Sequence, residues 1–179
     1  MTLATPVRAG VSLDELLAAK ERRAARQADW LTHHQQPVIS LTLVTPGQIK
    51  DSLRYRNTMG VALQMCDQLL WENRWQVLDR QVLWLPTGPE ALWCVAHPAA
   101  EIKAHCAELE QTHPLGRLWD LDVICPENGH VGRQSLGSHL RRCLICDEPA
   151  HACSRSRHHP VEQVVSRVEK MIDDWFARD

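Results

Sequence analysis

WQVLDRQVLWLPTGPEALWCVAH, Trp75 to His97, contains two apolar runs on either side of a tight turn. The first run ends at Pro86 and the second begins at Glu90, with the Thr87-Gly88 pair between them. Two apolar runs joined by so short a glycine-containing segment are typical of a β-hairpin. The sequence therefore predicts two paired strands here, as part of a larger sheet.

The residues before this hairpin predict a helix, a strand and a second helix. Ser12 and Glu15 have the spacing of a capping box, which begins an amphipathic helix. The segment PVISLTLVTPG, residues 37–47, alternates apolar and polar side chains in period two, as a half-buried strand does. From about residue 51 to residue 73 the apolar side chains recur at helical spacing.

The residues after the hairpin predict a helix, a second hairpin, a cysteine-rich lobe and a last helix. Pro98 opens the helix, and Asn128-Gly129 is the turn of the second hairpin. The cysteine-rich lobe covers about residues 139–159. A strongly periodic amphipathic helix follows over about residues 160–178.

This order of elements predicts an α+β fold in which helices cover a mixed β-sheet. With 179 residues the chain is long enough to close one sizeable core, so we expect a single domain over residues 1–179. Seven side chains in apolar runs are assigned to the core: Cys66, Cys94, Cys106, Cys125, Trp84, Trp93 and Trp119.

The composition argues against several classes of function. An apolar fraction of 44% and a charged fraction of 23% are ordinary for a folded globular protein. The formal net charge of -2 gives no broad attraction to nucleic acid or to an anionic membrane. No segment has the apolar length of a membrane span or a secretory signal, so we expect a cytoplasmic protein with reduced thiols.

Asp120 and Asp122 stand inside an apolar strand, LWDLDV, where each charge needs a partner. Alternate residues of a strand share a face, so the two carboxylates point the same way, with Cα atoms about 7 Å apart. Trp119 and Leu121 then point into the core. Two carboxylates at this separation can hold a divalent cation, and Mg²⁺ with substrate phosphates suits them. The alternative is two solvated carboxylates on an exposed sheet face.

Two glycine turns carry candidate substrate-binding residues. In TPGQIKDS, Gly47 lets backbone N–H groups approach an anion, and Lys50 adds a positive charge. In the turn before the aspartates, Gly116 supplies flexibility and Arg117 supplies a guanidinium suited to phosphate. Arg117 has the opposite strand parity to the aspartates, and a surface lysine is usually only solvated.

Cys143, Cys146, Cys153 and His159 provide three thiols and an imidazole, a set that suits a structural, tetrahedral Zn²⁺. The spacing matches no standard zinc finger, so buried free thiols are the alternative. His151 and His158 are alternative fourth ligands. Four nearby arginines could bind an acidic carrier protein or the phosphates of a substrate: Arg141, Arg142, Arg155 and Arg157.

The chain contains four segments, TPGQIKDS, TGPE, ELEQTHPLGRLWDLDV and RRCLICDEPAHACSRSRHH. In this order and at these intervals they resemble the citrate lyase holo-acyl-carrier-protein synthases, also called apo-citrate lyase phosphoribosyl-dephospho-CoA transferases. The resemblance extends from about Ser12 through the last helix. Its most specific part is HPLGRLWDLDV followed by RRCLIC and a third cysteine.

The resemblance implies an enzyme of nucleotidyltransferase type, with a nucleotidyltransferase-like fold. The donor would be 2'-(5''-triphosphoribosyl)-3'-dephospho-CoA, the acceptor a serine of the citrate lyase acyl-carrier (gamma) subunit, and the second product diphosphate. Asp120 and Asp122 match the pair that holds catalytic Mg²⁺ in nucleotidyltransferases and in the similar enzyme of malonate decarboxylase. Either could accept the serine proton, and we assign Lys50 and Arg117 to the phosphates as a hypothesis. The usual signature has a Gly-Ser or Gly-Gly turn well before its acid pair, whereas Gly116 closely precedes Asp120.

Two other functions fit parts of the sequence. A non-catalytic, zinc-stabilised adaptor would bind a carrier protein through its arginines, tolerate Asp120→Asn and depend on Cys143. A metal-dependent phosphohydrolase would use the same acid pair and need no acceptor protein.

Overall fold

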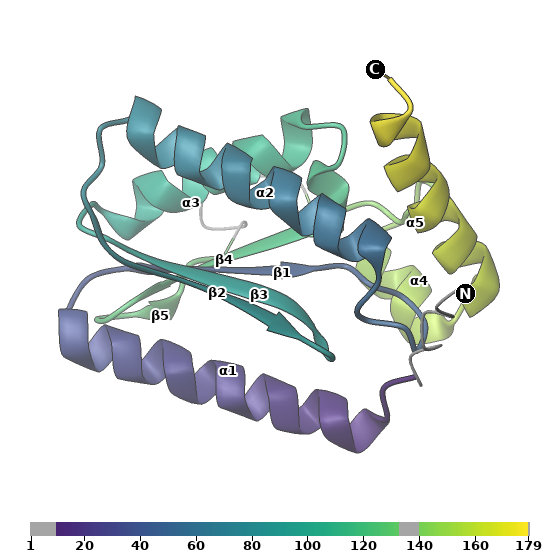
Figure 1. The fold of residues 1–179 in the computed structure, drawn as a ribbon, viewed down its shortest axis with the longest axis horizontal. Coiled ribbons are helices and arrows are strands. Elements are labelled where there is room, and N and C mark those ends of the chain that lie inside the picture. Colours follow the sequence, from purple (N-terminus) through teal and green to yellow (C-terminus); the bar gives the residue numbers. More distant parts are fainter. Residues whose placement is uncertain (1–9, 133–139, 179) are drawn as a thin grey trace, which may run out of the picture.

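The computed structural model describes residues 10–132 and 140–178, which form a five-stranded sheet with helices on both faces (Figure 1). The strands, in the spatial order β2-β3-β1-β4-β5, are β1 (Val38–Leu43), β2 (Val77–Leu85), β3 (Gly88–Val95), β4 (Trp119–Cys125) and β5 (Gly129–His130). The helices are α1 (Leu13–His34), α2 (Leu53–Glu72), α3 (Ala99–Thr112), α4 (Ala150–Ser156) and α5 (Val161–Phe176). A short 3-10 turn, η1, covers Gly116–Leu118.

The predicted elements are confirmed in kind and order. The capping box is formed, because the Glu15 amide donates to Ser12 Oγ over 3.2 Å and the Ser12 amide to Glu15 Oε2 over 2.7 Å. The first hairpin is β2 and β3, and Gly88 takes a φ of +115° at its turn. The sequence did not indicate η1 or α4, and in the described residues β5 covers only Gly129–His130.

The sheet is antiparallel at every described pairing, so the prediction of a mixed sheet was wrong. β1 lies between β3 and β4 and runs opposite to both. α3 carries the chain from β3 past β1 to β4, so β3 and β4 run the same way without pairing. An alternating pattern shows that a strand has a buried face, but it does not specify the direction of its neighbours.

One face of the sheet forms the core with α2 and α3, which lie side by side over it (Figure 1). Trp119, Leu121 and Val123 of β4 are fully buried in this core, as the alternation predicted. They belong to one cluster with side chains from the neighbouring strands and the two helices: Ile39, Leu41, Trp93, Met59, Leu70 and Ile102. The four cysteines assigned to the core are buried as well.

Trp84 is not a core residue, although its apolar surroundings in the sequence suggested one. Its side chain is 44% exposed, because β2 is an edge strand of the sheet. The guanidinium of Arg56 lies over its ring, 5.8 Å from the centroid, and shields part of it.

The opposite face of the sheet is covered by α1, largely through polar contacts (Figure 1). Glu90 of β3 is buried and pairs with Arg23 and Arg26 of α1 at 2.8 and 3.0 Å. Gln27 donates to the hydroxyl of Ser40 on β1 over 2.8 Å. These contacts lie over β1 and β3, and on β4 the side chain of Asp120 is half exposed.

The carboxyl-terminal residues gather at one end of the sheet (Figure 1). α5 packs beside the start of α2, where Arg54 contacts Asp173 over 2.9 Å, and it buries Val168 and Ile172 in the core. The cysteine-rich residues described, 140–159, form a loop followed by α4. Within the described ranges, no helix has both the length and the apolar character that crossing a membrane requires.

Candidate active site

Asp120 and Asp122 lie on one face of β4, as the sequence predicted. Their cross-strand partners on β1 are Thr42 and Ser40, so two carboxylates and two hydroxyl residues share this part of the sheet. The face is the one that α1 covers, away from the apolar core. The carboxylates are therefore held by a rigid strand and can be reached from outside the core.

Three side chains hold the outer edge of β4 at the level of the aspartates. In the described residues β5 pairs only with Ile124 and Cys125, and its continuation bonds to Val123. Lys103 of α3 donates to the carbonyl of Leu121 over 2.7 Å, and Glu110 accepts the amide of Leu121 over 2.7 Å. Arg141 donates to the carbonyl of Trp119. Along this part of β4, side chains thus make the backbone hydrogen bonds that a neighbouring strand would otherwise make.

Arg141 connects a buried carboxylate to a half-exposed one. Its Nη2 lies 2.9 Å from Glu110 Oε1 and 3.9 Å from Asp120 Oδ1. The side chain of Glu110 is 2% exposed and that of Arg141 is 20% exposed, so the pair is largely shielded from water. The guanidinium is fixed next to the candidate catalytic residues.

Lys103 and Glu110 were missed by the sequence analysis, although a signal was present. Both are buried on α3 together with Ile102, Cys106 and Ala107. These positions recur at helical spacing, so two charged residues interrupt the apolar face of a helix. A charge in that position needs a specific partner, which here is the backbone of β4.

The electrostatics of the aspartate pair favour a bound cation. Burial raises the pKa of Asp122 above its ordinary value, and the charge of Asp120 raises it further. Lys103, His130 and Arg141 act in the opposite direction. A cation between the two carboxylates would relieve the repulsion between their negative charges, so this donor set fits Mg²⁺.

Arg117 lies in η1 and not in the strand, so the parity argument against it does not apply. Its Nε donates to the carbonyl of Arg142 over 3.0 Å. Burial lowers the pKa of Arg117, and the positive charge of Arg141 lowers it further. Two partly desolvated guanidinium groups near one another attract an anion.

Gly116 is buried where η1 passes α3. A Cβ at this position would lie 2.4 Å from the carbonyl oxygen of Glu110, closer than real Cβ atoms come. The absence of a side chain therefore lets η1 and the end of α3 touch, which places Arg117 beside the start of β4.

Gly47 and Lys50, predicted together in one turn, line different cavities. Gly47 has a φ of +78°, and a Cβ added there would lie 3.1 Å from the side chain of Val165 on α5. Gly47 lines a cavity of about 860 Å³ together with Arg117 and Arg141. Lys50 donates to the carbonyl of Thr45 and lines two smaller cavities next to α1. Burial lowers the pKa of Lys50.

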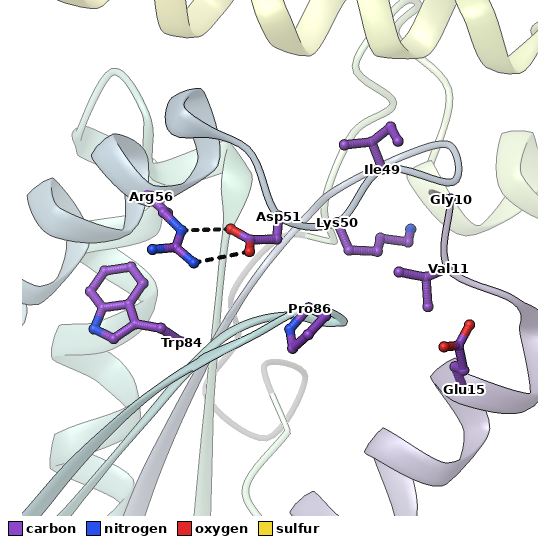
Figure 2. A pocket seen from close by; sticks show the side chains of 9 residues that line it. All are labelled: Gly10, Val11, Glu15, Ile49, Lys50, Asp51, Arg56, Trp84 and Pro86. Carbon is purple, nitrogen blue, oxygen red and sulfur yellow. Dashed lines mark hydrogen bonds and ion pairs between the residues drawn. The ribbon is translucent and has the colours of Figure 1, made fainter. Parts of the chain in front are cut away.

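One of these smaller cavities, of about 390 Å³, is shown in Figure 2. The buried carboxylate of Asp51 receives two hydrogen bonds from Arg56, of 2.7 and 3.0 Å. Because Arg56 also lies over Trp84, its guanidinium is held on two sides. The pair orders the segment between Lys50 and the start of α2.

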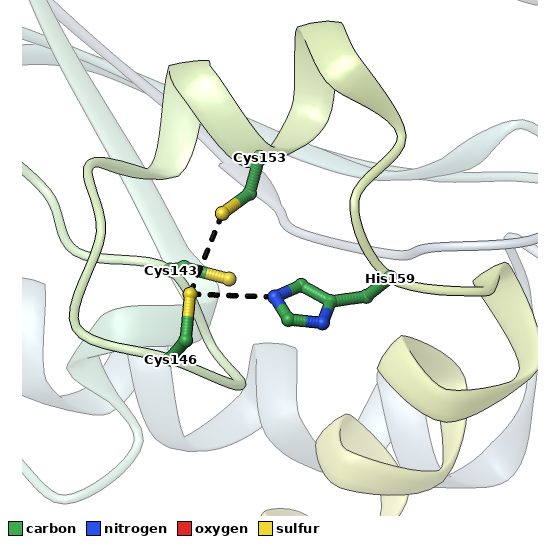
Figure 3. A group of neighbouring side chains, drawn as sticks. All are labelled: Cys143, Cys146, Cys153 and His159. Carbon is green, nitrogen blue, oxygen red and sulfur yellow. Dashed lines mark hydrogen bonds between the residues drawn. The ribbon is translucent and has the colours of Figure 1, made fainter.

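The predicted metal ligands converge (Figure 3). The Sγ atoms of Cys143, Cys146 and Cys153 and a ring nitrogen of His159 all lie within 4.8 Å of one another. Cys146 Sγ is 3.5 Å from Cys153 Sγ and 3.3 Å from Nε2 of His159. The Ile145 amide donates to Cys143 Sγ over 3.4 Å, as in a turn that presents thiolates to a metal. This group, with His159 as the histidine, could bind a metal ion.

Comparison with known proteins agrees with this chemistry. The family model for apo-citrate lyase phosphoribosyl-dephospho-CoA transferase matches residues 11–175. A protein of that name from Shigella flexneri serotype 5b (strain 8401) is 38% identical over 167 residues, which are 93% of this chain and 91% of that protein. A protein of the same name from Escherichia coli O1:K1 / APEC has the same identity and coverage.

Proposed function

Because the chain belongs to the apo-citrate lyase phosphoribosyl-dephospho-CoA transferase family, it transfers phosphoribosyl-dephospho-CoA to apo-citrate lyase, and we propose that Asp120 and Asp122 are its catalytic centre. The observation that carries the proposal is their position: two carboxylates share one face of β4, beside Arg141. The donor is 2'-(5''-triphosphoribosyl)-3'-dephospho-CoA. The acceptor is a serine of the acyl-carrier (gamma) subunit of citrate lyase.

In this reaction the serine oxygen forms a bond to the α-phosphorus of the triphosphate. The bond from that phosphorus to the bridging oxygen breaks, and diphosphate leaves with the electron pair. The serine proton passes to Asp120 or Asp122, whose carboxylates lie at the reacting end of the donor. In such a transfer, the rate acceleration comes mainly from positioning the reactants and from stabilising the charge on the phosphates.

In this proposal Asp120 and Asp122 would hold Mg²⁺, which would supply positive charge to screen the triphosphate. Arg117, together with Arg141, faces the charge that develops on the departing diphosphate. Gly47 contributes the turn after β1. Lys50, on the side of the same loop that faces α1, contributes a further positive charge. Gly116 acts indirectly, by letting η1 bring Arg117 close to β4.

The metal held by Cys143, Cys146, Cys153 and His159 is structural Zn²⁺ in this proposal. Three thiolates and an imidazole are the ligands that zinc prefers, and the set is complete without a water position. The ion would join the loop before α4, α4 itself and the residue before α5. Its role is to fix the cysteine-rich lobe against the sheet.

The intact mass of the apo acyl-carrier subunit tests the proposed function. The subunit is incubated with this protein, Mg²⁺ and the triphosphoribosyl donor, and in parallel with Asp120→Asn or with EDTA. We expect a mass gain equal to the donor minus diphosphate, lost in both parallel samples and restored by excess Mg²⁺ only in the sample with EDTA. Asp29→Asn, which removes an exposed carboxylate on α1, is the matched control and should transfer normally.

Other results would point to other functions. Release of phosphate from the donor without any gain on the carrier would indicate a phosphohydrolase. Full transfer by Asp120→Asn would remove this residue from the reaction.

A further inference from the structure

A cavity of about 860 Å³ beside the aspartates lies where four parts of the chain meet. They are the loop after β1, η1, the cysteine-rich lobe and the start of α5. We call it the arginine cavity, because Arg117, Arg141 and Arg157 line it. Its volume is in the range of sites that bind small molecules and cofactors.

The wall of the arginine cavity combines two kinds of surface. The three guanidinium groups can each make charged hydrogen bonds to phosphate oxygens. The remaining wall includes apolar side chains from the loop after β1, the lobe and α5: Val44, Leu144, Val161 and Val164. A triphosphate alone would leave this apolar part without a partner, so the lining indicates a ligand with both phosphates and an extended organic part.

One side chain, that of Arg141, borders both the arginine cavity and the candidate catalytic centre. Arg141 lines the cavity, and its Nη2 lies 3.9 Å from Asp120 Oδ1. Arg117, also in the wall, is close enough to Asp120 for that negative charge to act on its pKa. A molecule whose reacting phosphate lies at the aspartates can therefore extend past these two arginines into the cavity.

We infer that the arginine cavity binds the dephospho-CoA part of the donor, an inference that rests on the proposed function. The diphosphate of dephospho-CoA meets the guanidinium groups, and its adenine and amide chain lie against the valine and leucine side chains. The candidate metal cluster forms part of the cavity wall, because Cys143, Cys153 and His159 also line the cavity. The lobe thus serves as a wall of the donor site.

Binding of dephospho-CoA itself, measured by calorimetry with the full chain, tests this inference. Val164→Trp fills the cavity from α5, and we expect it to weaken binding at least tenfold. Arg157→Gln removes an exposed charge at no cost to the core, and we expect about a tenfold loss, the value of one charged hydrogen bond. Arg22→Gln, an exposed arginine on α1, is the matched control and should bind as the wild type does.

A second readout separates this inference from the proposed catalytic centre. Asp120→Asn should bind dephospho-CoA normally and yet fail to transfer, whereas Arg157→Gln should raise the KM for the donor and keep kcat. If Asp120→Asn transfers, the catalytic assignment fails and the cavity is still judged by its own variants. Equal binding of dephospho-CoA to wild type, Val164→Trp and Arg157→Gln, or no binding to the wild type, would overturn the inference.

Discussion

Glu110 and Arg141 form a shielded ion pair of 2.9 Å directly behind the strand that carries the two aspartates. The same carboxylate oxygen accepts the amide of Leu121, the residue between Asp120 and Asp122, over 2.7 Å. One buried side chain therefore fixes both the backbone of the candidate catalytic strand and the guanidinium that reaches Asp120.

Replacing Glu110 by Gln should impair both stability and transfer. Glutamine can still accept the Leu121 amide, but Arg141 loses its buried counter-charge, and breaking a buried pair typically lowers the free energy of unfolding by about 3 kcal/mol. Because Arg141 is then free to move from Asp120, we expect kcat/KM to fall on the order of 100-fold. Thermal unfolding and the transfer assay measure the two effects. Glu108→Gln, an exposed residue of the same helix, should change neither.

Asp122→Asn should make the protein more stable at neutral pH while it removes activity. The pKa of Asp122 is raised in the folded state, so the native protein binds its proton more tightly than the unfolded chain. Stability from this group is therefore lost as the pH rises through the interval from the ordinary carboxyl pKa to the raised one. Unfolding temperatures measured across pH should show the variant's advantage above that interval and none below it. A variant that is less stable than the wild type at pH 7 would contradict this account.

Cys146→Ser should remove the metal from the cysteine-rich lobe. Cys146 lies next to both Cys153 and His159, so its loss breaks the centre of the ligand set. We expect one zinc per chain in the wild type by elemental analysis, none in the variant, and a lower unfolding temperature because metal binding contributes directly to folding. Cys94→Ser changes a buried thiol outside the cluster and should keep its zinc. Equal zinc content in both variants would exclude this ligand set.

Two glycine substitutions should have opposite effects on stability. Gly116→Ala forces a Cβ against the backbone of Glu110 and should lower the free energy of unfolding by about 2 kcal/mol, with loss of transfer. Gly60 lies inside α2, is exposed, and leaves open space for a Cβ, so Gly60→Ala should raise it by about 1 kcal/mol. Chemical denaturation of both variants measures the difference. Equal unfolding free energies for the two would refute the packing argument.

The patterns that the sequence carries locally were sufficient for much of the fold. The capping box at Ser12, the hairpin turn at Gly88 and the parity of Asp120 and Asp122 each depend on residues close together in the chain, and all are found in the structure. Whether neighbouring strands run parallel or antiparallel was not predictable in this way. It depends on which strands become neighbours, and that is set by where each connection places the next strand in the sheet.

The surroundings of the aspartates depended on long-range contacts. Glu110 meets Leu121 and Arg141 only after α3 has folded against β4, so no short motif contains all three. The convergence of Cys143, Cys146, Cys153 and His159 was predictable, since cysteine and histidine at short intervals are typical of a metal-binding group. Trp84 was misassigned because an apolar run does not show whether its strand lies at an edge.

The side chains along β4 also affect whether this strand can pair with a strand of a second molecule. An open strand edge offers its amides and carbonyls to any other extended chain, which is a common route to aggregation. Here the amide and carbonyl of Leu121 and the carbonyl of Trp119 are already occupied by Glu110, Lys103 and Arg141. The contacts that orient the candidate catalytic strand therefore also close its edge to a second molecule.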